Sequence, residues 1–596
     1  MISLFFSLNY KRKLIEAIPI GTYLFMLIAY LLGITGHVSH IDSLFVLYEL
    51  AGLAGTAYLV LFKKAEIKEP FKDAGNLIFL VLLIIAWFLS LHMRVTNFDD
   101  FHSWAITPKD MYYVNGLPTG NMASTFYRDY FPLVYIMDFF VFKLTGGFKE
   151  STMFYVLWSL MLVSLAEMFH HREEDDVTRY VCRAACGVML PFLVSFQFLH
   201  CLGTDILATT IFGSALVYIM EGRAIGRGAF GRINPVQDKD KAQDLQAAKQ
   251  MDESFDYIRI VLAVTVLGMM KTTSLIFSMV CIGVYFVRNI EIKILSSWLR
   301  FVMLSAVTGG FWLSWKTFCK IKGNTTYLSD NLDRNLSGGH GGFPYYAGST
   351  IKEFTAKLFT YGLNDGTVGL TSVIILVVFI AAFIIYIKCS VKTDDISAKA
   401  SADERPLSGQ RAFREWLTFA VVILGMTGYL LVMIYIYLFV FEEWEALSLS
   451  SYDRYISTYF GAMLYMALFL LFTVKLGYRW IAPVFTLVLA VTINYPYVAK
   501  TLIPSGYARE YGGTVAEIEA IEDEFMQAAG ELPSYGESIL VVDYTTDQLR
   551  AKVIPYAAVP GVTRLIRPDE ETGSMPTEQD IADKAAEYNA RVIDLR

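Results

Sequence analysis

Apolar residues along the chain gather in continuous blocks, separated by short polar stretches, from residue 16 to residue 497. Each block is about 20 residues long, the length that a helix needs to cross a hydrocarbon core about 30 Å thick. A soluble protein of this length would instead place its apolar residues in short periodic stripes. The pattern therefore predicts an all-α polytopic membrane protein with about 13 transmembrane helices.

The composition agrees with this pattern, because hydrophobic residues make up 55% of the 596 residues and charged residues only 18%. The mean hydropathy is +0.44. At the N-terminus, apolar residues precede the basic cluster Lys11, Arg12 and Lys13, which is the reverse of a cleavable signal peptide. The basic cluster places the N-terminus in the cytoplasm.

The basic loops decide the expected topology, since Lys and Arg favour the cytoplasmic side of a membrane. Loops 63–72, 223–250 and 388–414 are basic. All three fall on the cytoplasmic side only if the short apolar run 131–144 lies on the outer face, as a re-entrant or interfacial helix. The outer face is then expected to receive the segments 94–149, 200–204, 319–365, 441–453 and 498–596.

The composition changes near residue 498, where the apolar blocks end. The tail 498–596 has a helical stretch at 515–529 and a strand-like run at 539–542. We interpret it as a small extracytoplasmic α/β domain that follows a transmembrane domain of residues 1–497. The expected location of the chain is the plasma membrane, with the N-terminus in the cytoplasm and the tail outside.

Two adjacent aspartates, Asp99 and Asp100, directly follow an apolar block and precede His102, Trp104 and Lys109. A carboxylate at the end of an apolar helix can simply mark the boundary with water. Ionisable residues at membrane depth are nevertheless costly and often functional. Adjacent carboxylates raise each other's proton affinity, so one can act as a base while the other holds a hydroxyl or a metal ion. We therefore take both aspartates as candidate catalytic residues, and the other three as candidate substrate-binding residues.

This loop resembles the first outer loop of GT-C membrane glycosyltransferases, a superfamily that includes protein O-mannosyltransferases and the lipid A aminoarabinose transferase. The resemblance rests on Asp99-Asp100 and on the run Tyr127-Arg128-Asp129-Tyr130-Phe131-Pro132-Leu133-Val134-Tyr135. Phe131-Pro132-Leu133 stands where relatives often have a Pro-Pro-Leu-Tyr-like run. Two additional helices precede the aspartates, which relatives usually carry after their first helix. The resemblance implies a GT-C-like fold that transfers a sugar from a polyprenyl phosphate to an acceptor outside the cytoplasm.

Three later positions agree with the resemblance in their order. Asp205 lies at an outer helix start, Lys271 interrupts two apolar segments, and Arg454-Tyr455 enters a late helix. The resemblance implies that Lys271 and Arg454 bind the donor phosphate, with Arg128 as a further candidate. It also implies that Asp205 and Tyr455 contact the substrate. Each charged residue has a plainer interpretation: a helix N-cap for Asp205, a lysine reaching lipid headgroups for Lys271, and pairing with a neighbouring carboxylate for Arg454.

Three further features are considered as possible parts of the site, and the first two leave alternatives open. The outer loop around 337–346 contains His340 and paired glycines, and is either an active-site flap that contacts substrate or a plain loop. A divalent cation, Mg²⁺ or Mn²⁺, is a candidate cofactor because Asp99 and Asp100 are suitable ligands. His170-His171 falls on the inner side with no carboxylate at ligand spacing, and receives no role.

The resemblance, taken with these residues, implies an enzyme of the cell envelope whose donor is a polyprenyl-phosphate monosaccharide. Asp99 or Asp100 removes the proton of an acceptor hydroxyl, and the attack inverts the anomeric carbon. The expected partners are the lipid bilayer, the donor, and a cell-envelope glycan or polymer as acceptor; no nucleic acid is expected. Two alternatives belong to other classes: a transporter or flippase for lipid-linked or anionic solutes, and a non-catalytic assembly subunit.

Overall fold

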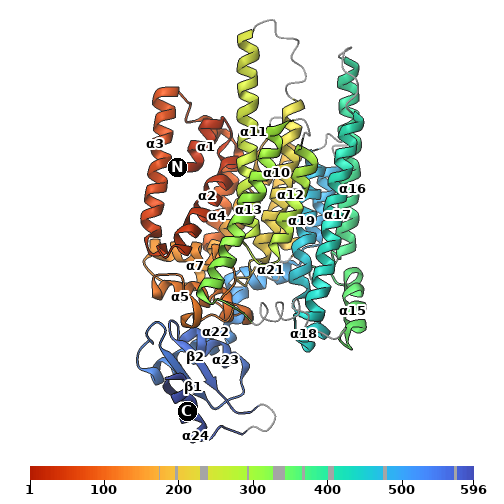
Figure 1. Ribbon diagram of the computed structural model, residues 1–596. Coiled ribbons are helices and arrows are strands. Elements are labelled where there is room, and N and C mark those ends of the chain that lie inside the picture. Colours follow the sequence, from red (N-terminus) through yellow and green to blue (C-terminus); the bar gives the residue numbers. More distant parts are fainter. Residues whose placement is uncertain are drawn as a thin grey trace.

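The fold is a bundle of helices with a small α/β unit attached at one end, as the computed structural model shows (Figure 1). We call this end of the bundle the domain end and the opposite one the far end. The structure describes residues 1–172, 175–194, 199–228, 239–290, 294–326, 343–364, 369–400, 408–473, 480–569 and 574–595.

The first half of the chain is helical. Its helices and short 3₁₀ or π turns, in order, are α1 (Ile2–Tyr10), α2 (Leu14–Ile34), η1 (Val38–His40), α3 (Ile41–Lys63), η2 (Glu69–Lys72), α4 (Ala74–Ser90), η3 (Asp100–Trp104), α5 (Ile106–Val114), η4 (Gly120–Met122), α6 (Leu133–Thr145), α7 (Glu150–Ser164), α8 (Ala166–Phe169), α9 (Val177–Leu193), α10 (Asp205–Gly228), α11 (Lys239–Gly268) and α12 (Ser274–Asn289).

The second half continues the bundle and ends in the α/β unit. Its elements are α13 (Leu295–Lys322), α15 (Ala347–Thr360), α16 (Ser372–Ala400), α17 (Ser408–Phe439), α18 (Glu443–Ser448), α19 (Tyr452–Thr473), α20 (Ile481–Val491), α21 (Tyr495–Leu502), α22 (Pro504–Ala529), β1 (Ser538–Asp543), α23 (Gln548–Ala557), β2 (Val562–Ile566), α24 (Glu578–Tyr588) and β3 (Arg591–Leu595). In Figure 1, α15 and α18 lie at the domain end.

The described helices include several that are long and apolar enough to cross a membrane. These five are Leu14–Ile34, Val38–Lys63, Ser372–Cys389, Ala412–Phe439 and Tyr452–Thr473. A sixth candidate is the pair Ala482–Val491 and Tyr495–Leu502, bent by 66° at a short break. The expected count of about 13 is therefore not confirmed. One reason is that α4, α7 and α12 have 17, 15 and 16 residues, fewer than the roughly 20 of a typical crossing.

Helix α19 lies at the centre of the bundle and α3 at its edge. The apolar window of α19 is 89% buried, whereas that of the α3 segment is only 17% buried. Helix α19 packs against α10 and α16. At the α10 contact, a Cβ added at Gly213 would lie 2.3 Å from Tyr465 Cδ1, so glycine permits the close approach. At the edge, α3 exposes Leu47, Leu61 and Phe62, a surface suited to lipid.

The short apolar helix α6 has 13 residues, which span about 20 Å. Before its start, Trp315 Nε1 donates a hydrogen bond to the carbonyl of Asp129 at 2.8 Å. Near its end, Lys143 Nζ donates to Asn115 Oδ1 at 3.1 Å. Helix α6 is thus joined to α13 before its start and to the residue after α5 near its end, and its placement on the outer face without crossing stays a prediction. Which end of the bundle faces the cytoplasm stays a prediction from loop charge.

The C-terminal unit is built on a three-stranded parallel sheet of order β2-β1-β3. Strand β1 is central, and its residues 539–542 are buried, as expected for a parallel strand covered on both faces. Helix α23 connects β1 to β2, and α24 connects β2 to β3. The strand-like run at 539–542 is thus confirmed, and the tail contains the small α/β unit that its composition predicts.

The C-terminal unit packs against loop 94–149 and the start of α7. The Tyr556 hydroxyl donates to Glu150 Oε1 at 2.7 Å, and Lys109 Nζ donates to the Tyr556 carbonyl at 2.9 Å. Ser124 Oγ donates to the carbonyl of Gly561 at 3.1 Å. Tyr556, Glu150 and Lys109 are buried. Because breaking buried hydrogen bonds to charged groups is costly, these contacts fix the unit on the loop.

Asp110 lies beside this interface and links stability to pH. It is fully buried, and its Oδ2 accepts a hydrogen bond from the Ser124 amide at 2.9 Å. Burial raises the pKa of Asp110 to about 7. The folded protein therefore keeps a proton that the unfolded chain releases near pH 4, so the free energy of unfolding falls as pH rises from about 4 to about 7. We expect Asp110→Asn to flatten this fall, measured by thermal melting of the solubilised protein across that range. An unchanged slope contradicts the assignment.

Candidate functional site

Four charged residues from distant parts of the chain meet at the domain end. Asp99 precedes η3, a π-type turn of a kind often found at functional sites. Asp205 is the first residue of α10, Lys271 lies between α11 and α12, and Arg454 is in the first turn of α19. The backbone N–H and C=O groups at helix ends have no hydrogen-bond partner within the helix, so polar side chains are readily accommodated there. We call these four residues the carboxylate–cation cluster.

Arg454 lies between the two carboxylates of the cluster. Its Nη1 donates to Asp99 Oδ2 at 2.6 Å, and its Nε lies 3.5 Å from Asp205 Oδ2. Lys271 Nζ forms an ion pair with Asp205 Oδ1, so Asp205 bridges the two cations. The Tyr455 hydroxyl accepts a hydrogen bond from Arg454 Nη2 at 3.0 Å, and Lys271 Nζ lies 5.5 Å from the Tyr455 ring centre. The structure thus brings five of the predicted site residues together.

The cluster is open to solvent mainly at Asp99. The side chain of Asp99 is 50% exposed, whereas those of Arg454, Lys271 and Asp205 are 15%, 13% and 3% exposed. Lys271 therefore pairs with a buried aspartate and does not reach out to lipid headgroups. The two carboxylates balance the two cations. An anionic ligand must consequently compete with Asp99 for Arg454.

Asp100 differs from Asp99 although the two are adjacent. It is fully buried, and both of its oxygens accept the amide hydrogen of Leu202, at 3.0 and 3.1 Å. Burial raises the pKa of Asp100 well above its usual range, and the charge of Asp99 acts in the same direction. A carboxyl in this setting holds the segment before α10 in place. Of the two candidate bases, only Asp99 is in contact with solvent.

His102 lies beside the cluster, among aromatic rings. Its ring centre is 6.2 Å from that of Phe98 and 4.8 Å from that of Phe126. Burial lowers the pKa of His102 to about 4, and the positive charge of Lys552 acts in the same direction. The imidazole is therefore neutral near pH 7, where it can donate or accept a hydrogen bond but adds no positive charge.

Three other predicted residues lie outside the cluster. Lys109 is buried against the C-terminal unit, where it donates to the Tyr556 carbonyl. Arg128 donates to two backbone carbonyls of its own loop at 3.3 and 3.4 Å. Trp104 is buried beside Tyr130, with ring centres 5.4 Å apart. Arg128 and Trp104 thus contact their own loop 94–149, whereas Lys109 joins this loop to the C-terminal unit.

The side chains around Asp99 and Asp100 do not form a metal site. Within the described parts of the chain, no three His, Cys, Asp or Glu side chains are placed to hold one metal ion. Arg454 engages Asp99 and the Leu202 amide engages Asp100, so different groups occupy the two carboxylates. We therefore assign no role in the reaction to a divalent cation. The predicted substrate contact His340 lies outside the residues that the structure describes.

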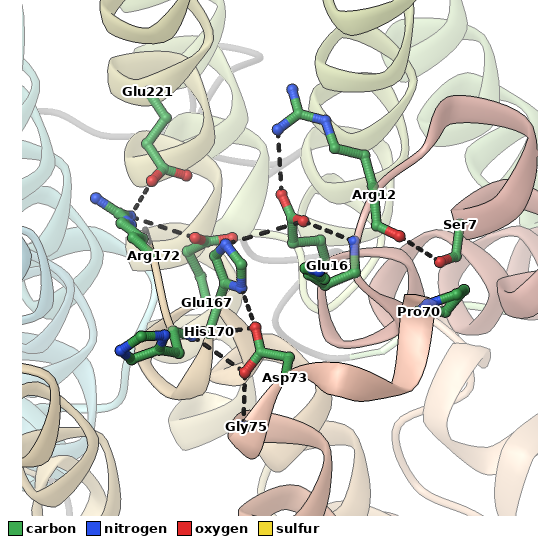
Figure 2. Close-up of polar contacts among 12 residues, drawn as sticks. Ser7, Arg12, Glu16, Pro70, Asp73, Gly75, Glu167, His170, Arg172 and Glu221 are labelled. Carbon is green, nitrogen blue, oxygen red and sulfur yellow. Dashed lines mark hydrogen bonds and ion pairs between the residues drawn. The ribbon is translucent and has the colours of Figure 1, made fainter. Parts of the chain in front are cut away.

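A second set of charged side chains, which the sequence did not reveal as a set, lies elsewhere in the bundle; its carboxylates are buried (Figure 2). Glu221 of this set lies 16 residues after Asp205 on α10, which corresponds to about 24 Å along the helix. We call the set the far-end charge network; it consists of Glu16, Asp73, Glu167, His170, Arg172, Glu221, Asp256 and Arg259.

Each member of this network has a partner of opposite charge. Glu167 lies between two arginines, 3.2 Å from Arg172 Nη2 and 2.7 Å from Arg259 Nη1. His170 Nδ1 lies 2.5 Å from Asp73 Oδ2, and its Nε2 lies 3.9 Å from Glu16. The view that His170 has no partner carboxylate is therefore wrong. Asp73 is 97 residues away in sequence, so local spacing gave no sign of this contact.

The chain was compared with known proteins at three levels. No family model matches it, and neither a curated protein sequence nor a solved structure does so. The function must therefore be argued from the residues and their geometry.

Proposed function

We propose that the chain is an integral-membrane glycosyltransferase that moves a sugar from a polyprenyl-phosphate donor to an extracytoplasmic cell-envelope acceptor by inverting displacement. The carboxylate–cation cluster carries the proposal. It places a half-exposed carboxylate, Asp99, beside the cation Arg454, and Asp205 bridges Arg454 to a second cation, Lys271. A base next to cations that stabilise a phosphate leaving group is the arrangement that this reaction requires.

Asp99 is the proposed general base. Its carboxylate takes the proton of the acceptor hydroxyl, and the oxygen forms a bond to the anomeric carbon. The bond from that carbon to the phosphate oxygen breaks, and its electron pair leaves with the polyprenyl phosphate. Because the acceptor attacks from the side opposite the leaving group, the anomeric configuration inverts. The proton ends on Asp99.

Arg454 and Lys271 are the proposed ligands of the donor phosphate. Without donor, Arg454 Nη1 is held by Asp99 at 2.6 Å. A phosphate competes for this guanidinium through charge-assisted hydrogen bonds and thereby frees the Asp99 carboxylate for the acceptor. Asp205 keeps both cations in place during the exchange, since one of its oxygens faces each of them. The charge that develops on the leaving phosphate is then stabilised in a partly buried site, where electrostatic interactions are strong.

A transporter or flippase for lipid-linked or anionic solutes is the second candidate. The far-end charge network favours it, because buried ionisable residues within a membrane bundle are typical of ion and proton pathways. The first candidate is favoured because Asp99 is solvent-exposed next to the cations, whereas the network's carboxylates are buried in internal ion pairs.

Donor turnover by the purified protein separates the two candidates. The wild-type protein in lipid nanodiscs is incubated with polyprenyl-phosphate hexoses and pentoses that carry a radiolabelled sugar, together with a cell-envelope glycan fraction. An enzyme produces free polyprenyl phosphate and labelled glycan. A transporter leaves the donor chemically intact and, in liposomes, moves it between leaflets. Intact donor across the whole panel contradicts the proposed function.

A further inference from the structure

A small mixed surface of aromatic rings and one cation adjoins Asp99. Phe98 and Phe126 are 45% and 53% exposed, and both of their rings contact the ring of His102. Lys552 Nζ lies 4.8 Å from the centre of the Phe98 ring. The three rings come from loop 94–149, whereas Lys552 comes from α23 of the C-terminal unit. We call these four residues the rim surface.

Lys552 brings an unneutralised positive charge to the rim surface. It is half-buried, and within the described part of the chain no carboxylate lies within ion-pair distance of its Nζ. Burial lowers the pKa of Lys552, while the negative charge of Asp99 opposes this effect. Two arginines near Lys552 in the same unit, Arg550 and Arg567, are instead held by Asp543. Lys552 is thus a cation held near Asp99 and available to a ligand.

We propose that the rim surface is the acceptor subsite, and that it takes an anionic glycan. This inference rests on the proposed function, because it assigns the acceptor side of the same site. Exposed aromatic faces can stack on the apolar C–H faces of a sugar ring. A lysine ammonium binds a carboxylate or phosphate group on the glycan. A glycan bound in this way has its acceptor hydroxyl next to Asp99, at the edge of the rim surface.

The elements that carry the three cations support separate binding positions for the donor and the acceptor. Arg454 and Lys271 contact Asp99 and Asp205 from the ends of bundle helices. Lys552 instead belongs to α23 of the C-terminal unit, which lies at the domain end of the bundle in Figure 1, and its Nζ contacts the Phe98 ring. The donor phosphate and the anionic group of the acceptor therefore each have a cation of their own, on different elements, with Asp99 next to both sets.

Binding of fluorescently labelled oligosaccharides, without any donor, tests the inference. The probes are an oligogalacturonate and a neutral galacto-oligosaccharide of the same length, titrated against the full-length protein in nanodiscs. We expect the wild-type protein to bind the acidic probe about tenfold more tightly than the neutral one, equivalent to about 1.4 kcal/mol, because only the acidic probe forms a charge-assisted hydrogen bond with Lys552. Lys552→Met removes this preference and Lys552→Arg retains it. Added salt weakens binding of the acidic probe only.

Two further variants control for folding and for the aromatic contribution. Lys584→Met removes an exposed lysine of α24 in the same unit and should leave binding of both probes unchanged. Phe126→Ala should weaken binding of both probes alike. Equal affinity of the wild-type protein for the two probes, or an undiminished preference in Lys552→Met, overturns the inference. Because the assay contains no donor, absence of turnover contradicts the proposed function without touching this result.

Discussion

Asp99→Asn is expected to reduce sugar transfer by roughly 10²–10⁴-fold while the protein stays in the membrane. The amide has nearly the same size as the carboxylate, and its oxygen can still accept a hydrogen bond from Arg454 Nη1. It cannot take a proton from the acceptor hydroxyl, so the loss is in the chemical step. The measurement is the rate at which label appears in the acceptor glycan at saturating donor, normalised to the amount of membrane-inserted protein.

Asp100→Asn is the matched control for this variant, because it makes the same change at the neighbouring residue. The Asp100 carboxyl is fully buried, and its role is to accept the Leu202 amide hydrogen. An amide oxygen can do the same, and no buried charge is left without a partner. We therefore expect the loss of transfer to stay below about tenfold. Full activity of Asp99→Asn would show that Asp99 is not the base. Equally large losses in Asp99→Asn and Asp100→Asn would mean that the two carboxyl groups act together.

Arg259→Met is expected to lower the free energy of unfolding by about 3–5 kcal/mol, the cost of breaking a buried ion pair by removing one partner. The Arg259 guanidinium lies 2.7 Å from Glu167, 3.4 Å from Glu221 and 3.3 Å from Asp256. Its removal leaves three buried carboxylates with less compensating charge. The effect is measured as the shift in thermal and denaturant unfolding of the detergent-solubilised protein.

Arg300→Met provides the control for loss of an arginine from the same part of the bundle. Arg300 pairs with Glu253 at 3.3 Å, but their side chains are 35% and 42% exposed. An exposed pair contributes about 0–1 kcal/mol, so this variant should unfold close to the wild type. Adding Glu167→Gln to Arg259→Met should recover part of the lost stability, since it removes the buried negative charge that is left in excess over the remaining cations. If Arg259→Met melts like the wild type, the network does not stabilise the bundle.

The sequence predicted the kind of fold better than the number of crossings. Blocks of apolar residues indicate membrane helices because burial in lipid depends on composition over a short window. They do not show where a block bends. The last apolar block, which ends at residue 497, is divided in the structure between α20 and α21, which are bent by 66° relative to each other, and Pro496 lies in the first turn of α21. A proline there starts a new helix and allows the bend.

The sequence predicted some of the residues that meet in the site and also some that do not. Asp99, Lys271 and Arg454 were chosen as charges at the ends of apolar blocks, and they meet. Lys109 was chosen because it follows the aspartate pair and Arg128 because it lies in the run that carries the resemblance, but one faces the C-terminal unit and the other its own loop. A charge at a block end is equally suited to a ligand and to a structural contact, so only its neighbours in space distinguish the two.

The sequence by itself determined the helical membrane character, the small α/β unit at the end of the chain and the set of charged residues at block ends. All three depend on hydrophobic and polar patterns that act over neighbouring residues. The tertiary structure decided which charges pair: Arg454 with Asp99, 355 residues away, and His170 with Asp73. It also decided that Asp100 is buried while Asp99 is half-exposed. Ion pairing and burial depend on distances between helices that are remote in sequence, which no local pattern records.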